Sequence, residues 1–336
     1  MSKTKEPAIR KTSVGGQALI EGIMMNGPKG AALSVRKSDG TIYTEMKDFK
    51  KAGDKYKILR LPLIRGVVNF IESMILGYKC LMESAELSGQ LEAEENTENM
   101  SKLDKWLNDK MGPKMMNIIS VISMILGFAI AILLFMYLPA KGVDLFDKYV
   151  SAGWLDSHNL HPLFEGLIRI IIFVLYMLIV SFNKDIKRVF MYHGAEHKTI
   201  FCYEHGLELT VENVRKMKRF HPRCGTSFIF LVLIISIIVS SVLSSVLHAL
   251  NATVILDNSI LWVLIKLLVL PLVVGIGYEC IKLAGRKDNV FTRIISAPGL
   301  WMQRISTKEP TDDMIEVGIA SVKAVITDNP DDDTLK

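Results

Sequence analysis

Four long apolar segments limit the folds that are open to this chain of 336 residues. They occupy approximately residues 116–138, 163–182, 228–248 and 259–281. Each has the roughly 20 apolar residues that a helix needs to cross a hydrocarbon core of about 30 Å. Because every backbone polar group must be satisfied inside a bilayer, such segments cross it as helices. The sequence therefore predicts a predominantly α-helical, polytopic membrane protein with about four transmembrane helices and the lipid bilayer as its surroundings.

Positive charge predicts the orientation of these segments. The stretch between the second and third segments, 183–227, is rich in Lys and Arg, whereas 249–258 has neither and 139–162 has only Lys141 and Lys148. By the positive-inside rule, 183–227 and both termini are cytoplasmic, in a multi-pass protein of the bacterial cell (inner) membrane. The excess of basic residues is then explained by topology. Basic patches interleaved with aromatics are not evident, so no nucleic-acid partner is expected.

The N-terminal quarter of the chain has a different pattern. Residues 1–12 are expected to be a flexible leader, and residues 13–60 a small cytoplasmic α+β domain. The run 31–36 and the run 41–46 alternate apolar and polar residues on either side of Asp39-Gly40. An Asp-Gly pair between alternating runs is a strong signal for a β-hairpin.

Residues 61–86 are expected to form an amphipathic helix. Its polar residues recur on one narrow face at 3.6 residues per turn, namely Arg65, Asn69, Glu72, Lys79 and Glu83. The flanking stretches 1–60 and 83–115 both contain many basic residues, which places both on the cytoplasmic side. An interfacial or re-entrant helix is therefore favoured over a fifth span.

The remaining segments follow from composition. Residues 87–115 are expected to be an acidic linker with a short helix, and 116–281 the four-span membrane domain with 183–227 as its cytoplasmic motif loop. Residues 282–336 are expected to be a cytoplasmic helical tail. Within the tail a helix is predicted over 313–326, where Asp313 and Glu316 have the spacing of a capping box. Lys266, near the outer end of the fourth segment, can extend to the membrane surface.

A candidate metal site follows the second apolar segment. Residues 193–199 read HGAEHKT, which contains the pattern H-x-x-E-H. On a helix His193 and His197 share one face, as zinc ligands at i and i+4 do. This order is that of the inverted zinc-hydrolase signature, in which Glu196 would be the general base. Zinc or another divalent metal is therefore the expected cofactor.

The missing ligands have three candidate sources. His221 and Cys224 are three residues apart in HPRCGT, and Glu279 is a carboxylate in the fourth apolar segment. If one helix continues from the second segment to Gly206, Glu204 lies on the motif's face but about 10.5 Å beyond His197, too far to share an ion. Glu196 as a ligand would leave no base, and the site would then be structural.

Longer stretches of the chain carry a family resemblance. They are GGQALIEGIMMNGP (15–28), RGVVNFIESMILGYKCLMESA (65–85), YHGAEHKTIFCYE (192–204), HPRCGTSF (221–228), YECIKLAGR (278–286) and PGLWMQ (298–303). Together they resemble the YqhQ-like family of bacterial integral membrane proteins. The resemblance implies a metal-dependent enzyme. It also implies one constellation of site residues. Its members are His193, Glu196, His197, His221, Cys224 and Glu279, together with Glu21, Glu72, Glu204, Arg286 and Gln303. From the sequence itself, Glu21 is expected to be a buried partner of an Arg such as Arg65.

Two functions from different classes remain open. The first is a zinc-dependent membrane hydrolase, with a peptidase as one form, acting at the cytoplasmic membrane face. The second is a non-catalytic factor that binds or assembles membrane proteins or peptides, in which the polar cluster or its metal is structural. An open coordination position on the metal would indicate catalysis, and a closed four-ligand site would indicate structure.

Overall fold

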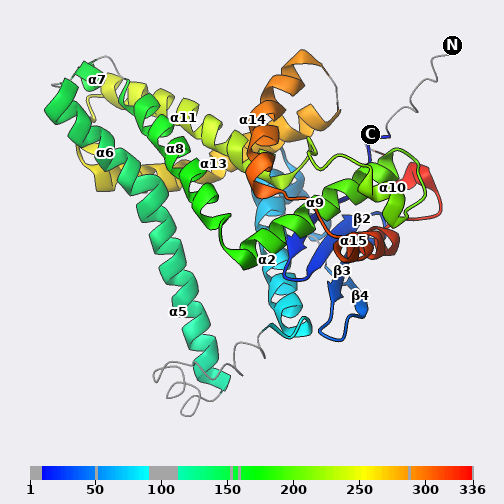
Figure 1. Cartoon of the computed structure of the whole chain (residues 1–336). Coiled ribbons are helices and arrows are strands. Elements are labelled where there is room, and N and C mark those ends of the chain that lie inside the picture. Colours follow the sequence, from blue (N-terminus) through cyan, green and yellow to red (C-terminus); the bar gives the residue numbers. More distant parts are fainter. Residues whose placement is uncertain are drawn as a thin grey trace. The chain divides into compact units, whose positions relative to one another are not determined.

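The computed structural model describes residues 10–49, 52–90, 113–151, 154–157, 160–286 and 289–334 (Figure 1). The chain divides into two compact units. The first, here called the sheet unit, comprises Met1–Leu91, Met177–Val232 and Val274–Lys336. The second, the helical unit, comprises Glu92–Tyr176 and Leu233–Val273. Most of the predicted leader and of the predicted acidic linker lies outside the described residues.

The sheet unit contains a four-stranded antiparallel meander in the order β1-β2-β3-β4. The strands are β1 (Gly15–Leu19), β2 (Gly22–Gly27), β3 (Gly30–Arg36) and β4 (Ile42–Lys47). The hairpin predicted around Asp39-Gly40 is confirmed, because β3 and β4 pair with Arg36 opposite Ile42. Gly40 adopts a φ of 85°, a conformation that glycine reaches without steric cost. The strand β1 lies at one edge of the sheet.

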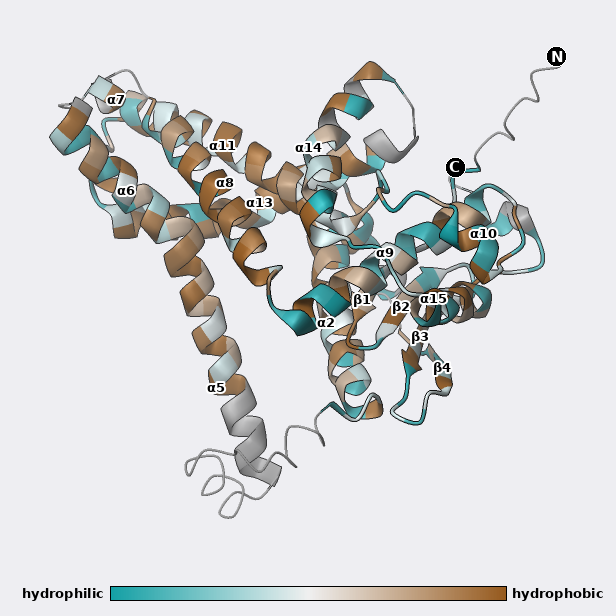
Figure 2. Ribbon diagram, viewed as in Figure 1, coloured by the Kyte–Doolittle hydropathy of each residue, from teal (hydrophilic) through white to brown (hydrophobic). Residues whose placement is uncertain are grey.

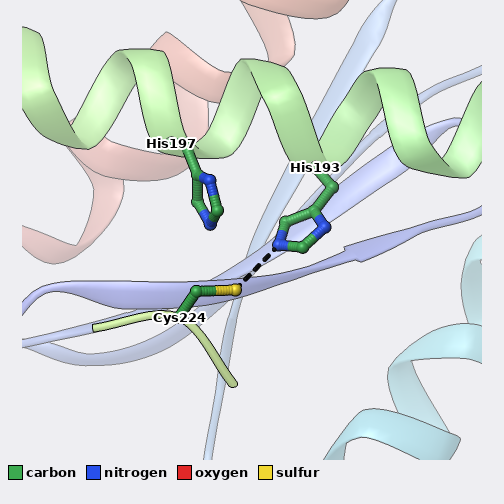
Figure 3. Close-up of side chains that lie close together, drawn as sticks. All are labelled: His193, His197 and Cys224. Atoms are coloured by element: carbon green, nitrogen blue, oxygen red, sulfur yellow. Dashed lines mark hydrogen bonds between the residues drawn. The ribbon is translucent and has the colours of Figure 1, made fainter. Parts of the chain in front are cut away.

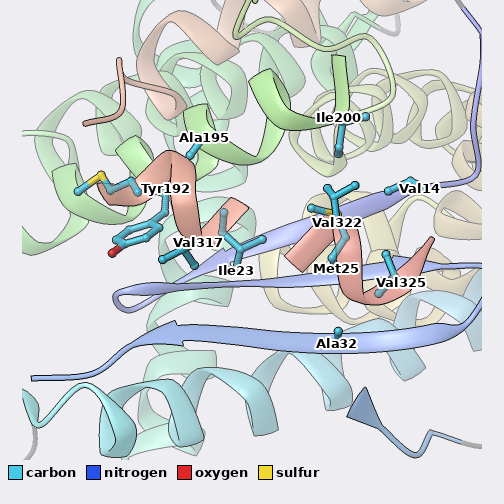
Figure 4. Close-up of a cluster of buried hydrophobic side chains, with 11 residues drawn as sticks. Val14, Ile23, Met25, Ala32, Tyr192, Ala195, Ile200, Val317, Val322 and Val325 are labelled. Carbon is cyan, nitrogen blue, oxygen red and sulfur yellow. The ribbon is translucent and has the colours of Figure 1, made fainter. Parts of the chain in front are cut away.

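Helices cover both faces of this sheet. Along β2, Ile23 and Met25 point into one apolar cluster and Met24 into another, as the twofold alternation of a strand requires (Figure 4). The first cluster is closed by α9 (Lys184–Glu204) and α15 (Asp312–Val325). The second is closed by Leu76 and Cys80 of α2 (Ile64–Leu87). The sheet is thus the middle layer of three.

The domain boundaries predicted from the sequence divide segments that belong to one folded unit in the structure. In its described residues, the segment 13–60 adds to its strands only two single turns, α1 (Ala52–Lys55) and η1 (Lys57–Arg60). A sheet with two apolar faces cannot be buried by such short pieces, so segments distant in the chain supply the helices. The motif loop and the tail therefore belong to the same folded unit as the N-terminal strands.

The motif lies on a helix of its own. The helix α8 (His161–Val180) ends before it, and the Asn183 side chain then caps α9 by accepting from the N–H groups of Asp185 and Ile186. The second apolar segment therefore does not continue as one helix through the motif. The predicted stop at Gly206 is confirmed, because this residue has a φ of 66° and the Leu207 N–H donates to the Cys202 carbonyl.

The tail and the loop after the motif complete the sheet unit. They contain α10 (Val211–Arg215), α14 (Val290–Ser306) and the short η4 (Pro330–Asp333). The helix predicted over 313–326 is confirmed as α15, but the capping box is not. Thr311 is the N-cap residue and makes no side-chain cap. Glu316 instead pairs with Arg36 of β3, so a contact between distant segments replaces the local one.

Among the described residues, four helical stretches are long and apolar enough to cross a membrane, namely Val121–Val150, His161–Val180, Gly225–Ala249 and Ser259–Leu283. The first continues from α5 (Pro113–Ile132) through η2 (Leu133–Tyr137) and α6 (Leu138–Phe146) into η3 (Asp147–Ser151). The third is α11 (Gly225–Ala249), and the fourth lies in α13 (Ser259–Arg286). Figure 2 shows the predominance of apolar residues along them. The four predicted spans are thus present as helices, which suggests a lipid environment.

The helical unit contains a buried ionic cluster that the sequence analysis did not identify. Glu165 of α8 pairs with Arg169 of the same helix and with Lys266 of α13, and all three side chains are buried. The indole N–H of Trp262 donates to the other carboxylate oxygen at 2.8 Å. Lys266 thus points inward, and the expectation that it reaches the membrane surface is wrong. Two short helices, α7 (Trp154–Ser157) and α12 (Val254–Asp257), complete this unit.

Candidate metal centre

Three potential metal ligands converge in the sheet unit. His193 and His197 project from one face of α9, and Cys224 lies opposite them just before α11 begins (Figure 3). One ligand atom from each of the three lies within 4.8 Å of the others. His193 Nε2 lies 3.1 Å from Cys224 Sγ. The helical spacing of the motif therefore produces the shared face that the sequence predicts.

Backbone carbonyls fix the orientation of both imidazoles. His193 Nδ1 lies 2.8 Å from the Ser306 carbonyl oxygen, and His197 Nδ1 lies 2.5 Å from that of Arg219. A carbonyl only accepts, so each Nδ1 carries a hydrogen and donates it. This leaves each Nε2 directed at the space beside Cys224. Metal-binding histidines are held in this way by a second hydrogen bond.

The thiol of Cys224 is placed to be a thiolate. Its sulfur accepts from the Thr226 N–H at 3.4 Å and lies 3.2 Å from the Thr226 hydroxyl, at the N-terminal end of α11. Burial opposes ionisation, but the neighbouring imidazoles lower the pKa of Cys224 well below its usual value. In return, against the effect of burial, the thiolate raises the pKa of His193 to about 9. A divalent cation would replace the proton that this pair shares.

Glu196 completes the centre with one unpaired oxygen. Its Oε1 accepts from the N–H of Gly16 in β1 at 3.0 Å. Its Oε2 is buried and, among the described residues, has no hydrogen-bond partner, and the same is true of His197 Nε2. Burial raises the pKa of the Glu196 carboxyl, although the adjacent imidazoles oppose the rise. Buried polar atoms usually have a partner in the protein or a water molecule, so these two atoms make the cluster a candidate ligand site.

His221 supports the centre and does not contribute a ligand. Its ring packs beside that of His197, with 5.6 Å between centroids. Its Nδ1 accepts from the Arg223 N–H at 3.3 Å, and its Nε2 lies 3.4 Å from Glu204 Oε2. Both ring nitrogens are therefore engaged away from Cys224. The sequence-based assignment of His221 as a ligand is corrected, because the turn that presents Cys224 rotates His221 toward Glu204.

Gln303 and Glu204 hold that turn in place. The Gln303 side-chain amide accepts from the N–H of His221 and donates to its carbonyl, both at 2.7 Å. Glu204 pairs with Arg223 and accepts from the N–H and hydroxyl of Thr12 at 2.9 and 3.0 Å. The last residues of the predicted leader are thus fixed in the structure. Both supporting roles fit the constellation that the family resemblance implies.

The other proposed members lie apart from the three ligands. Glu279 forms an ion pair with Arg65 of α2, which removes it as a ligand. Glu21 pairs with Arg188 at 2.5 Å, so the expected arginine partner is confirmed, although it is Arg188 and not the suggested Arg65. Glu72 accepts from the Ala52 N–H at 2.6 Å, and the side chain of Arg286 lies outside the described residues. Each of these carboxylates is satisfied by a partner that spacing along the chain does not predict.

Two glycines mark close approaches between backbone segments that were not predicted from the sequence. A Cβ on Gly194, inside the motif, would lie 2.0 Å from the Lys308 carbonyl oxygen. The chain after α14 therefore crosses α9 at this glycine, which brings the Ser306 carbonyl to His193. A Cβ on Gly16 would lie 2.6 Å from the Met24 carbonyl and 3.2 Å from Glu196 Cδ. A glycine inside a helical motif was the available clue to such a close approach.

Comparisons with known proteins give a family and no activity. The model of the family described as "Protein of unknown function (DUF1385)" matches residues 61–328. The "Uncharacterized protein YqhQ" of Bacillus subtilis (strain 168) is 32% identical over 334 residues, which cover 97% of this chain and 95% of that protein. No solved structure matches the chain.

Proposed function

This chain belongs to the DUF1385 family, and we propose that it is a zinc-dependent hydrolase, acting on peptides at the cytoplasmic face of the membrane. The observation that supports the proposal is the pair of unpartnered buried atoms at the three-ligand cluster, Glu196 Oε2 and His197 Nε2. A purely structural cluster of side chains would be expected to satisfy its own polar atoms.

The donor set fits zinc. Two imidazole nitrogens and one thiolate are ligands that zinc prefers, and three protein ligands leave one of its four tetrahedral positions open. Both imidazoles are oriented by backbone carbonyls, as in known zinc sites. When bound in such a site, zinc supplies Lewis acidity toward a substrate carbonyl and makes water easier to deprotonate.

Glu196 is placed to move the proton in hydrolysis. Gly16 holds its Oε1, so Oε2, which has no partner among the described residues, is free to accept a proton from water. The water oxygen forms a bond to the carbonyl carbon, the carbon–nitrogen bond breaks, and Glu196 passes the proton to the leaving nitrogen. Burial raises the pKa of Glu196, which brings the carboxyl closer to the neutral range where both transfers are efficient.

The outer face of α2 supports a location at the membrane surface. Its polar Arg65, Asn69 and Glu72 face protein partners, whereas apolar side chains are exposed along the opposite side. The exposed set comprises Ile64, Ile71, Met74, Ile75, Tyr78 and Met82. A helix with an outward apolar stripe and basic residues beside it is typical of an interfacial helix. The basic stretch 183–227 supports the cytoplasmic side.

An open coordination position is the direct test of catalysis. The full-length protein in detergent is loaded with Co²⁺, and acetohydroxamate is added while the visible absorption of the cobalt is followed. We expect a spectral change, because the inhibitor enters the open position. Cleavage of a quenched fluorescent peptide library by the zinc form should disappear in Glu196→Gln, with the metal content unchanged. No spectral change would contradict catalysis and favour the non-catalytic membrane-protein binding or assembly factor.

A cysteine hydrolase is the second candidate, because His193 Nε2 lies 3.1 Å from Cys224 Sγ. In that case Cys224 is the nucleophile and His193 holds the proton for the leaving group. Peptide cleavage that survives chelation but stops after iodoacetamide treatment would support this function. Cleavage that stops on chelation and returns with zinc would support the metal enzyme.

A further inference from the structure

The edge strand β1 has backbone groups at Ala18 that make no hydrogen bond among the described residues. In its pairing with β2, Gly16 lies opposite Met25 and Ala18 opposite Ile23. The Gly16 N–H donates to Glu196, so it points away from β2. Side-chain and hydrogen-bond directions alternate along a strand, so the N–H and carbonyl of Ala18 point to the same free edge. Within the described part of the chain, no hydrogen bond engages them.

This free edge begins at the candidate metal centre. Gly16 is exposed to solvent, whereas Glu196, which its N–H contacts, is buried. The strand edge and the proton-transfer group are therefore connected by one hydrogen bond of 3.0 Å. A chain bound along β1 would pass the exposed side of this contact.

Glycine also leaves room at the end of β1 nearest the centre. A Cβ on Gly15 would meet nothing within 4 Å, and Gly16 presents no side chain beside Glu196. The two residues of β1 nearest Glu196 therefore offer backbone and no side chain to a bound chain. Recognition there would depend on main-chain hydrogen bonds, which any extended peptide can form.

We propose that the substrate is an extended, unfolded polypeptide segment that binds along the free edge of β1 as an additional strand and presents a peptide carbonyl to the metal centre. Ala18 supplies the N–H and carbonyl that position it, and Gly16 and Glu196 mark where the strand reaches the ligands. The inference rests on the proposed metal-dependent function and adds its substrate class. Selection would be for backbone conformation more than for side-chain identity.

The test compares three hydroxamates on the Co²⁺-loaded full-length protein. Acetohydroxamate probes the metal alone, a tripeptide hydroxamate probes metal and edge together, and its backbone N-methylated analogue cannot pair as a strand. We expect the tripeptide hydroxamate to bind at least about tenfold more tightly than acetohydroxamate, and N-methylation to remove that gain. Equal binding of the tripeptide and its N-methylated analogue would overturn the inference.

Substitutions at Ala18 test the same point from the protein side. Ala18→Pro removes the outward N–H at a place where an edge strand tolerates proline, and Ala18→Gly keeps the N–H as the matched control. We expect only Ala18→Pro to weaken the tripeptide hydroxamate, again about tenfold, with acetohydroxamate binding and metal content unchanged. If neither substitution matters, the edge is not the binding site. If no hydroxamate alters the cobalt spectrum, the proposed function itself fails.

Discussion

Two buried carboxylates, Glu165 in the helical unit and Glu196 in the sheet unit, differ in how completely their oxygens are paired. Glu165 has Arg169 and Lys266 on one oxygen and the Trp262 N–H on the other. Glu196 has the Gly16 N–H on Oε1 and, among the described residues, nothing on Oε2. The first carboxylate is fully paired within the protein, whereas the second is left incomplete.

This difference distinguishes structure from function. A buried charge costs several kcal/mol unless it is paired, so a fold keeps an incomplete one only where something else completes it. Glu165 then stabilises the packing of α8 against α13, and nothing about it requires a ligand. Glu196 Oε2 and the adjacent His197 Nε2 have no partner among the described residues, which is the observation behind the metal centre that we propose for the sheet unit.

The largest expected effect is the loss of folding stability when the paired carboxylate, Glu165, is removed. Glu165→Ala leaves Arg169 and Lys266 buried without a counter-charge and should destabilise the protein by about 3–5 kcal/mol, as a large fall in melting temperature in detergent. The matched truncation Glu196→Ala, in chelator-treated protein, removes one hydrogen bond from the Gly16 N–H and should cost about 1 kcal/mol. Similar losses from both truncations would remove the distinction between the two sites.

A smaller effect is expected from the residues that support each site. Gln303→Ala removes the amide that holds the His221 backbone and thus the turn bearing Cys224, so zinc affinity should fall about tenfold or more. Ser236→Ala removes a contact to Arg169 in the helical unit and should leave zinc affinity unchanged. Competition with a coloured chelator measures both. An unaltered affinity in Gln303→Ala would mean that the turn is positioned independently of this clamp.

The smallest expected effect is the change in folding stability when the ionisable group of Glu196 is removed. Burial raises its pKa in the folded protein, so ionisation lowers stability as the pH rises above the ordinary carboxyl value of about 4.3. In metal-free protein at pH 7.5, Glu196→Gln should therefore be more stable than wild type. The gain should vanish as the pH falls below that ordinary value. Thermal unfolding across this pH range is the measurement, and a variant less stable at pH 7.5 would contradict the account.

The sequence predicted what depends on local pattern. The four apolar spans, the hairpin around Asp39-Gly40, the helix stop at Gly206 and the shared face of His193 and His197 follow from periodicity and turn chemistry. The sequence did not reveal which distant partners satisfy each polar group. Glu279 was assigned to the metal because its contact with Arg65 depends on how α2 packs near α13.

One missed feature had a readable local signal. Glu165 and Arg169 are four residues apart in an apolar segment, the spacing of an ion pair on one helix face. Their partner Lys266 is distant in the sequence, and only packing shows that it points inward. The carbonyls of Ser306 and Arg219, which orient the two imidazoles, had no such signal because any residue supplies a carbonyl.

The most direct test of the metal centre is the zinc content of the full-length protein, purified in detergent without chelator. Wild type, Cys224→Ala and His221→Gln are measured side by side by mass spectrometry. The account predicts about one zinc per chain in wild type and in His221→Gln, and almost none in Cys224→Ala, because His221 supports the site without binding the metal. Wild type without zinc, or zinc retained in Cys224→Ala, would contradict it.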